Sequence, residues 1–307
     1  MASDPGPAPA QETGASAEAF AFLARLERWA DLDTSPATPA ARAALLAHLR
    51  GEQAAHAASG LVHQLAARAL DVADGAVLRG DPPAGLRAHL ARSCAAEHGD
   101  LEGARAAVAR TAGGIVTQRG GWIATVSFSS SVREALLDVH RRGLGPRALV
   151  SEGRPRLGGR RLAAALGAAG VPVWLVVDGA LPMLLSQAAA LWLGADAVTD
   201  RGAIVPVGGY AAALAAREHS VPVHVLAARR KFLPASTAAL RIEEMQAGEV
   251  WDAPVPGVRP RNVCAELLPL ELLRGVVVET EVLGPTEAAT VARERPLPEE
   301  LAGPAGR

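Results

Sequence analysis

The chain has 307 residues, half of them hydrophobic, so it is long enough to bury a large core and to form more than one domain. Its net charge of −1 and isoelectric point of about 6.7 argue against a generally basic surface of the kind that binds nucleic acids or membranes. The two cysteines, Cys94 and Cys264, are far apart and lack any metal-binding spacing. We therefore expect a cytoplasmic protein without a disulfide framework.

Residues 1–16 are rich in Pro, Ala and Gly and contain no basic patch followed by an apolar run, which favours a disordered tail over a signal peptide. From residue 17 to residue 112, apolar residues recur at helical spacing, with breaks at 33–39 and 80–83. The first of these apolar residues are Phe20, Leu23, Leu26 and Trp29. We predict a helical N-terminal domain over 17–112. Its histidines show no metal-like spacing, and we expect no metal or other cofactor.

Beyond about residue 113, short β-rich runs alternate with amphipathic stretches. Strands are predicted at 122–127, 148–151, 171–177, 191–193, 221–227 and 276–279, and helices at 131–142, 159–169, 181–190 and 209–219. Such alternation implies right-handed βαβ units and a parallel sheet covered on both faces. The predicted fold class is therefore α/β, with the helical domain followed by a Rossmann-like, mostly parallel sheet domain over 113–285. A flexible tail is expected over 286–307.

An arginine-rich turn follows the predicted strand that ends at Ser151. It contains Glu152, Arg154 and Arg160 and leads directly into the next helix. In open parallel sheets the ligand lies beyond the carboxyl ends of the strands, where arginines and the N-terminus of a helix can hold a phosphate. The alternative is a solvated turn in which Glu152 forms a salt bridge.

Other polar residues follow the remaining strands. A serine run, Ser129, Ser130 and Ser131, could form a cradle of hydroxyl and N–H groups or could cap the following helix. Asp178 and Asp196 each follow a strand, and each could hold a ligand hydroxyl or only close a turn. The sequence contains no P-loop, no nucleophile elbow and no complete dinucleotide-binding fingerprint.

Seven segments resemble the regulatory subunits of translation initiation factor 2B and their relatives. Residues 123–132 are similar to ILTHSYSSTV, residues 151–155 with 159–160 to TESRP…GR, and Val177-Asp178 to the strand end VDSA. In the same order, residues 194–198 are similar to GADAI, Gly208 with Tyr210 to KIGTY, residues 227–234 to APTYKFDP, and residues 262–269 to NPAFDVTP. The resemblance covers roughly residues 100–280, and it also implies a helical domain followed by a Rossmann-like domain.

The same superfamily contains methylthioribose-1-phosphate isomerase and ribose-1,5-bisphosphate isomerase, in which a cysteine and an aspartate are thought to transfer the proton. The resemblance puts Asp196 at the position of the aspartate and Ser127 at that of the cysteine. A serine hydroxyl is a far weaker acid than a thiol. Val205-Pro206 stands where the enzymes carry an Asn-Lys pair that contacts the substrate. Gly208 and Lys231, the only lysine of the chain, fall on motif positions and are further candidates for ligand binding.

These departures favour a non-catalytic or regulatory protein that binds a sugar phosphate or a nucleotide. The alternative is an aldose-ketose sugar-phosphate isomerase with an altered active site. A phosphorylated small molecule is the expected partner, and we expect neither a nucleic acid nor a membrane. Because family members pair through their Rossmann-like domains, the resemblance also implies a homodimer.

Overall fold

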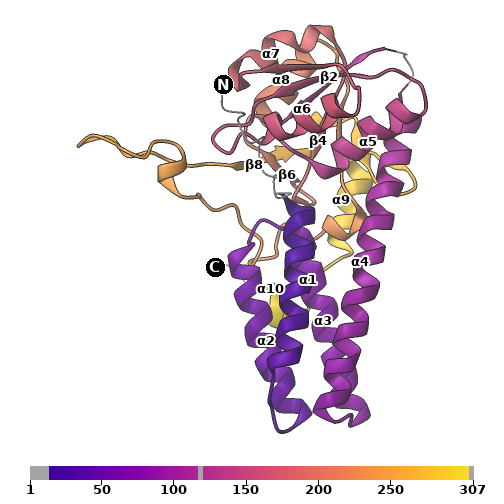
Figure 1. Ribbon diagram of the computed structural model, residues 1–307, viewed down its shortest axis with the longest axis vertical. Helices are drawn as coiled ribbons and strands as arrows, with labels where there is room; N and C mark the ends of the chain where they lie inside the picture. Colours follow the sequence, from indigo (N-terminus) through magenta and orange to yellow (C-terminus); the bar gives the residue numbers. More distant parts are fainter. Residues whose placement is uncertain (1–13, 117–119, 304–307) are drawn as a thin grey trace, which may run out of the picture.

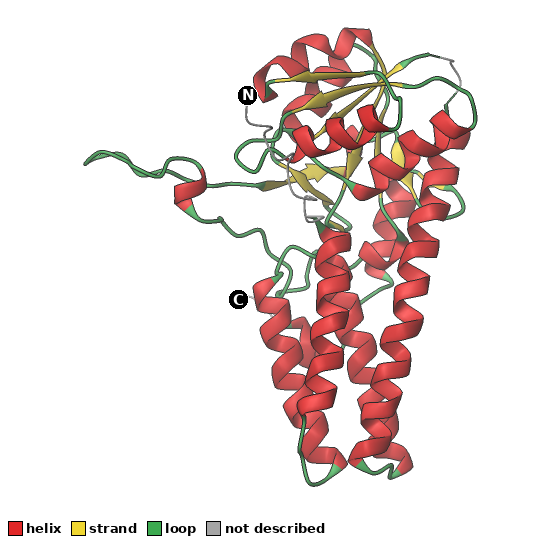
Figure 2. Ribbon diagram, viewed as in Figure 1, coloured by secondary structure: helices red, strands yellow, loops and turns green. Residues whose placement is uncertain are grey.

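A computed structural model describes residues 14–116 and 120–303, and most of the predicted tail 1–16 therefore lies outside the described residues (Figures 1 and 2). Four long helices form a bundle at one end of the molecule. They are α1 (Ala15–Leu32), α2 (Thr38–Ala55), α3 (Gly60–Arg79) and α4 (Pro83–Gly114). The prediction of a helical N-terminal region is confirmed, including the breaks near 33–39 and 80–83. The further break at 56–59 is not marked by a proline and is missed by the sequence pattern.

The bundle core consists of leucine, alanine and phenylalanine side chains. Of the first predicted set, Leu23 and Leu26 are buried, whereas Phe20 and Trp29 are only partly buried. Phe22, Leu45, Leu49, Leu70 and Leu86 are all fully buried. Burial of large apolar side chains such as these contributes about 1.5–3 kcal/mol each. Helix α4 has 32 residues and continues past the bundle to pack against helix α5 (Ser130–Arg141). It thereby joins the bundle to the sheet, as Figure 1 shows.

The second part of the chain forms a seven-stranded sheet with the order β10-β9-β7-β4-β1-β2-β3. The parallel strands are β1 (Trp122–Val126), β2 (Arg147–Ser151), β3 (Val173–Val176), β4 (Ala188–Gly194), β7 (Val223–Leu226) and β9 (Gly275–Val277). Strand β10 (Val282–Leu283) runs antiparallel to β9. The remaining long helices of this part are α6 (Gly158–Ala168), α8 (Gly209–Glu218) and α9 (Pro285–Arg293). The predicted α/β class, with a mostly parallel sheet, is confirmed.

The predicted helix at 181–190 is wrong in its second half. Helix α7 covers only Leu181–Leu184, a 3-10 turn follows at Leu185–Gln187, and strand β4 already begins at Ala188. Leu191, Trp192 and Leu193 are buried because β4 lies in the middle of the sheet, between β1 and β7. An alanine-rich run at the end of an apolar stretch fits a buried strand as well as a helix.

The chain also forms a small antiparallel sheet that is absent from the sequence predictions. Its strands are inserted between β4 and β7 and between β7 and β9. It consists of β5 (Ala197–Val198), β6 (Gly202–Pro206) and β8 (Ala265–Pro269). The expected flexible tail over 286–307 is also wrong as far as residue 303. Helix α9 and the short helix α10 (Glu299–Ala302) occupy that stretch, and Leu297 and Leu301 are buried against the bundle.

Residues 241–263, called the arm below, leave the body of the protein and return to it just before β8. Figure 1 shows the arm reaching far from the body, with the 3-10 turn η4 (Ala247–Glu249) partway along it. Most side chains of the arm are exposed, and Asn262 near its end is buried. The arm is a long excursion with little regular secondary structure.

Candidate functional site

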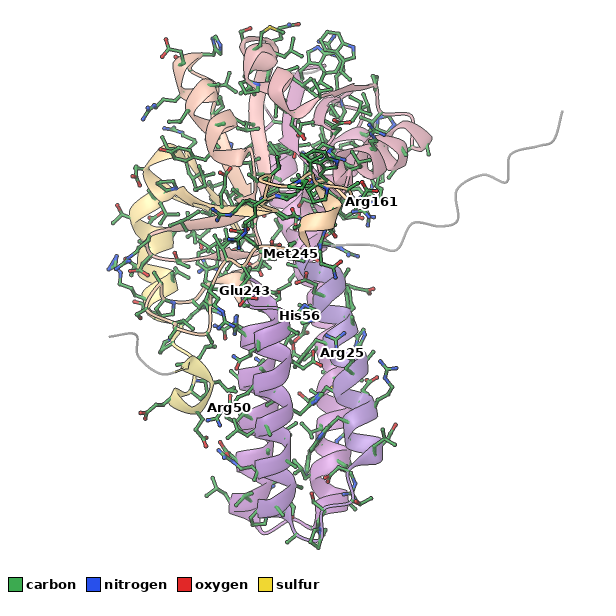
Figure 3. All side chains as sticks on the ribbon, turned by 90° about the vertical axis from the view of Figure 1, so that its left-hand side faces the viewer. Arg25, Arg50, His56, Arg161, Glu243 and Met245 are labelled. Carbon is green, nitrogen blue, oxygen red and sulfur yellow. The ribbon has the colours of Figure 1, made fainter. Side chains whose placement is uncertain are left out.

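A cleft of about 230 Å³ lies where the helical bundle meets the carboxyl edge of the sheet. Its walls come from segments far apart in the chain: the start of α1, the α2–α3 connection, the turns after β1 and β2, and the beginning of the arm. Figure 3 shows His56, Arg161, Glu243 and Met245 gathered at this junction. The cleft is thus at the edge of the sheet where an open parallel sheet is expected to bind its ligand.

Ser127 directly follows β1 and has a backbone conformation that few residues adopt. Its φ of 58° lies in the left-handed region, where a side chain costs energy. A Cβ atom added to Gly153 would lie only 2.5 Å from the Ser127 Oγ, and one added to Gly158 only 2.6 Å from it. Neither position therefore has room for a side chain. Ser127 is therefore clamped between two glycines and lines the cleft.

The turn after β2 is held in place by Asp178. The Asp178 carboxylate accepts hydrogen bonds of 2.8 Å from the backbone N–H groups of both Gly153 and Arg154. This arrangement uses the Asp178 oxygens to orient the turn. Of the two roles that the sequence left open for Asp178, the contacts favour the structural one.

Four arginines line the cleft: Arg154, Arg156, Arg161 and Arg241. The Arg154 guanidinium donates to the carbonyl oxygen of Val250 at 3.3 Å, and Arg156 is paired with Glu249 at 3.2 Å. Arg161 lies over the ring of Phe128, and Arg241 donates to Glu243 at 2.6 Å. Helix α6 begins at Gly158, which also lines the cleft, so the positive end of its dipole faces the same space.

Asp196 follows shortly after the end of β4 and also lines the cleft. Burial raises the pKa of its carboxyl to about 6, while the nearby Lys231 ammonium and a hydrogen bond from the Ala15 backbone N–H partly oppose that rise. Lys231 is buried and donates a 2.6 Å hydrogen bond to the carbonyl oxygen of Ala195. Burial in turn lowers the pKa of Lys231. The floor of the cleft therefore carries a carboxyl group that titrates near neutral pH.

The bundle supplies Glu18 and His56 to the cleft. Arg25 is paired with Glu52 at 2.6 Å and donates to His56 Nε2 at 2.9 Å. Because Arg25 can only donate, Nε2 of His56 is the acceptor in this contact. The other ring nitrogen, Nδ1, lies 3.7 Å from Glu18. The bundle wall is therefore a fixed polar surface beside Asp196.

Several residues singled out from the sequence lie elsewhere. Arg160 is paired with Glu152 at 2.7 Å, and neither residue is among those that line the cleft. This is the solvated salt bridge that the sequence left open as the alternative. Gly208 begins α8 with a φ of 94°, a conformation that favours glycine.

The serine run is used mainly for local structure. Ser129 accepts a hydrogen bond from the Val132 backbone N–H and caps α5, and Ser130 donates to Ser16 Oγ at 2.9 Å. Ser131 is buried beneath these contacts. Of the two alternatives, the capping role is the one that these contacts support.

The cleft residues that sequence reasoning missed include Glu18, His56, Arg241, Glu243 and Met245. No local signal marks them, because the cleft brings together residues as distant as 18 and 245. The two residues of the Val205-Pro206 pair have different surroundings. Val205 is buried in the sheet core, and Pro206 lines the cleft.

Cys264 also lines the cleft, and its thiol donates to Asn262 Oδ1 at 3.0 Å. Burial raises the pKa of this thiol, so it stays protonated near neutral pH. Among the described residues, no group of three or more His, Cys, Asp or Glu side chains is arranged to hold a metal ion. Within the same ranges no helix has the length and apolar character needed to cross a membrane.

Comparison with known proteins gives relatives of two kinds. The chain is 35% identical over 173 residues to methylthioribose-1-phosphate isomerase of Synechococcus sp. (strain CC9605), covering 53% of this chain and 51% of that protein. It is 31% identical over 172 residues to ribose 1,5-bisphosphate isomerase of Archaeoglobus fulgidus, covering 54% of this chain and 55% of that protein. It is also 32% identical over 166 residues to a putative translation initiation factor eIF-2B subunit 2-like protein of Pyrococcus furiosus, covering 53% and 58%. The chain thus spans about half the length of the curated relatives it matches.

The fold is shared with solved structures. A translation initiation factor eIF-2B from Pyrococcus horikoshii OT3 superimposes with a TM-score of 0.75 at 22% identity, covering 88% of this chain and 91% of that one. The 5-methylthioribose 1-phosphate isomerase of the same organism gives a TM-score of 0.66 at 20% identity, covering 90% and 81%. The family model described as the initiation factor 2 subunit family matches residues 85–283, well over half of the chain. The chain therefore belongs to the initiation factor 2 subunit family.

Proposed function

We propose that the protein binds a phosphorylated small molecule, a sugar phosphate or a nucleotide, in the cleft and that its role is regulatory and not catalytic. The observation that carries the proposal is the combination of charged groups that line the cleft. Arg154, Arg156, Arg161 and Arg241 line it together with the start of α6, and the carboxyl groups of Asp196 and Glu18 also line it.

This combination of cationic and anionic groups fits one class of ligand. Guanidinium groups and a helix N-terminus bind phosphate oxygens, and carboxylates accept hydrogen bonds from hydroxyl groups. A molecule with a phosphate at one end and hydroxyl groups at the other satisfies both sides. A purely apolar ligand would form neither ion pairs with the guanidinium groups nor hydrogen bonds with the carboxylates.

The serine at position 127 and the proline at position 206 both disfavour catalysis. A serine hydroxyl titrates far above the neutral range in which a proton shuttle is efficient. Pro206 offers neither an N–H donor nor a charge to a substrate, and Val205 beside it faces the core.

The second candidate is a sugar-phosphate isomerase, the activity named for two of the relatives above. A specific observation favours it: the pKa of Asp196 is raised to about 6, which suits a residue that gives and takes a proton near neutral pH. Ser127, at the position of the cysteine in the enzymes, is a poor second acid or base for isomerisation. We therefore keep this function as the alternative.

Thermal shift with matched ligand pairs tests the proposal. AMP is compared with adenosine, and glucose 6-phosphate with glucose, so that only the phosphate differs within a pair. A ligand at a hundredfold excess over its Kd stabilises the folded protein by about 2.7 kcal/mol. We expect a rise in Tm with at least one phosphorylated member and none with its partner. Equal behaviour of the two members of every pair would refute a phosphate site.

A further inference from the structure

A second cavity, of about 310 Å³, lies at the amino edge of the main sheet, opposite to the edge that carries the cleft. Its walls come from the beginnings of β1 and β4, the turns that lead into β2 and β7, and the residues that end α4. The strands are parallel, so their amino ends meet at this edge. Its volume lies at the lower end of the roughly 300–1,000 Å³ that small-molecule pockets in proteins occupy.

The walls of this cavity are mainly apolar. The larger aliphatic residues that line it are Ile115, Val116, Ile123, Pro146 and Pro222. Of the described residues in its lining, none has an ionisable side chain apart from His224. A charged ligand would lose its hydration here without gaining an opposite charge, which is costly. The lining therefore favours an uncharged molecule.

His224, in β7, is the polar group of this lining that lacks a partner. Its side chain is 8% exposed, and neither ring nitrogen forms a hydrogen bond with any residue in the described ranges. Burial, together with the positive charge of the nearby Arg274, lowers the pKa of the ring to about 4. The imidazole is therefore neutral near neutral pH and offers one N–H donor and one acceptor nitrogen. Because Nδ1 is shut off from solvent, a molecule in the cavity reaches the ring at Nε2.

Trp192, in β4, lies beside His224. The two residues are direct partners in the register of β4 and β7, so their side chains are on the same face of the sheet. Trp192 is 1% exposed, lines the same cavity, and its indole N–H has no acceptor within the described part of the chain. Buried polar groups without partners cost free energy, and phenylalanine at either position would avoid that cost. Stability of the empty protein thus gives no reason for this pair.

Water fits this cavity less well than an organic ligand does. A buried water molecule needs about 2–4 polar partners, and the cavity offers the His224 ring and the Trp192 indole among walls that are otherwise apolar. Water elsewhere in the cavity would be poorly held. A ligand that replaces such water with apolar contacts gains affinity.

We propose that this cavity binds an uncharged, flat small molecule that carries a hydrogen-bond donor next to an acceptor, as a lactam does, with His224 as the polar anchor and Trp192 beside it. The proton of a neutral imidazole resides on either nitrogen, and a lactam satisfies Nε2 in both cases because it both donates and accepts. An aromatic ligand also gains from contact with the indole of Trp192. This site shares no lining residue with the cleft and does not depend on the ligand proposed there.

Three bicyclic compounds serve as probes. Quinolin-2-one is an uncharged lactam, naphthalene lacks the hydrogen-bonding group, and 2-naphthoate carries a negative charge. Binding to the full chain is followed by two-dimensional NMR of the indole N–H signals, and Trp192→Phe identifies the signal of Trp192. Affinities come from titration of the same signal.

Two variants and a control accompany wild type. His224→Phe removes both ring nitrogens at similar size, and Ala190→Leu places a larger side chain in the cavity, on the same face of β4 as Trp192. His219→Phe is the matched control, because His219 is exposed at the end of α8 and is not part of the lining. Circular dichroism checks that the variants fold.

We expect quinolin-2-one to shift the Trp192 signal and to bind at least fivefold more tightly than naphthalene or 2-naphthoate. His224→Phe should weaken its binding at least fivefold, Ala190→Leu should abolish it, and His219→Phe should leave it unchanged. No shift of the Trp192 signal with quinolin-2-one would show a cavity filled by water only and would overturn the site. Equal binding of quinolin-2-one and naphthalene, or equal binding by wild type and His224→Phe, would overturn the role of His224.

Urea unfolding without any probe gives a second, independent readout. Because the His224 ring forms no hydrogen bond with a residue in the described ranges, His224→Phe should unfold at the same urea concentration as wild type or at a higher one. A clear loss of stability would show that ordered water already satisfies the ring. That result would contradict an anchor held open for a ligand.

Discussion

The carboxyl group of Asp196 and the ammonium group of Lys231 interact in the buried floor of the cleft, and each favours the charged form of the other. Burial acts against both charges and is the larger effect on each. The pKa of Asp196 is thereby raised from 3.8 to about 6. The cleft that we propose for an anionic ligand thus contains a carboxyl group with a pKa near neutral.

The first prediction concerns stability against pH. Because the pKa of Asp196 is higher in the folded state, its contribution to the free energy of unfolding is complete below pH 4 and is lost as pH rises through about 6. The loss amounts to roughly 1–3 kcal/mol at about 1.4 kcal/mol per pKa unit, reduced for partial solvent access. Urea unfolding of wild type and Asp196→Asn at pH 4.5 and 7.5 measures it. Between pH 4.5 and pH 7.5, Asp196→Asn should become more stable relative to wild type.

A substitution of Lys231, the charged partner of Asp196, tests the same account. The variant is Lys231→Met. Removing the ammonium takes away a group that lowers the pKa of Asp196. The loss of stability should then extend to higher pH than in wild type. A difference between wild type and Asp196→Asn that stays constant from pH 4.5 to 7.5 would contradict the buried-carboxyl account.

The second prediction concerns the start of α6. A Cβ on Gly159 would lie 1.7 Å from the carbonyl oxygen of Ser151, a contact with backbone that cannot move aside. Gly167 in the same helix has no atom within 4 Å of its Cβ position. Gly159→Ala should therefore cost at least about 2 kcal/mol, whereas Gly167→Ala should be neutral or stabilise by up to about 1 kcal/mol. Chemical denaturation of both variants decides it, and equal stabilities would be inconsistent with the close packing of α6 against β2.

The third prediction is that the chain lacks isomerase activity. Ser127 is a poor proton shuttle, and the Asn-Lys pair expected at Val205-Pro206 is missing. These losses affect different parts of the transition state, so Ser127→Cys alone should also stay inactive. Proton exchange into product, followed by NMR with methylthioribose 1-phosphate or ribose 1,5-bisphosphate, tests this. Turnover by wild type that Asp196→Asn abolishes would favour the enzyme alternative.

The fold was predictable from the sequence where a local pattern repeats. Leu23 and Leu26, predicted at helical spacing, are both buried along one face of α1. The β-rich runs at β1, β2 and β7 are strongly apolar because both faces of the parallel sheet are covered. Strand β5 has only two residues, too few for any periodicity, and the small sheet that contains it could not be predicted.

The site was predictable only in part, because its geometry depends on contacts between distant segments. Arg154 and Arg160 are equivalent in the sequence pattern, but Asp178 orients the turn at Arg154 while Arg160 turns toward Glu152. The neighbouring Arg161 faces the cleft instead, since successive residues of a helix point in different directions. Which arginine meets the ligand is thus decided by tertiary structure.

The central claim is tested most directly by calorimetric titration of wild type, Arg154→Ala and Arg160→Ala. The ligand is the phosphorylated compound that gives the largest thermal shift. A lost hydrogen bond to a charged group costs about 1.5–3 kcal/mol. We therefore predict at least about tenfold weaker binding for Arg154→Ala and unchanged binding for Arg160→Ala. Absence of binding by wild type, or equal weakening by the two substitutions, would contradict the assignment of the cleft as a phosphate-binding site.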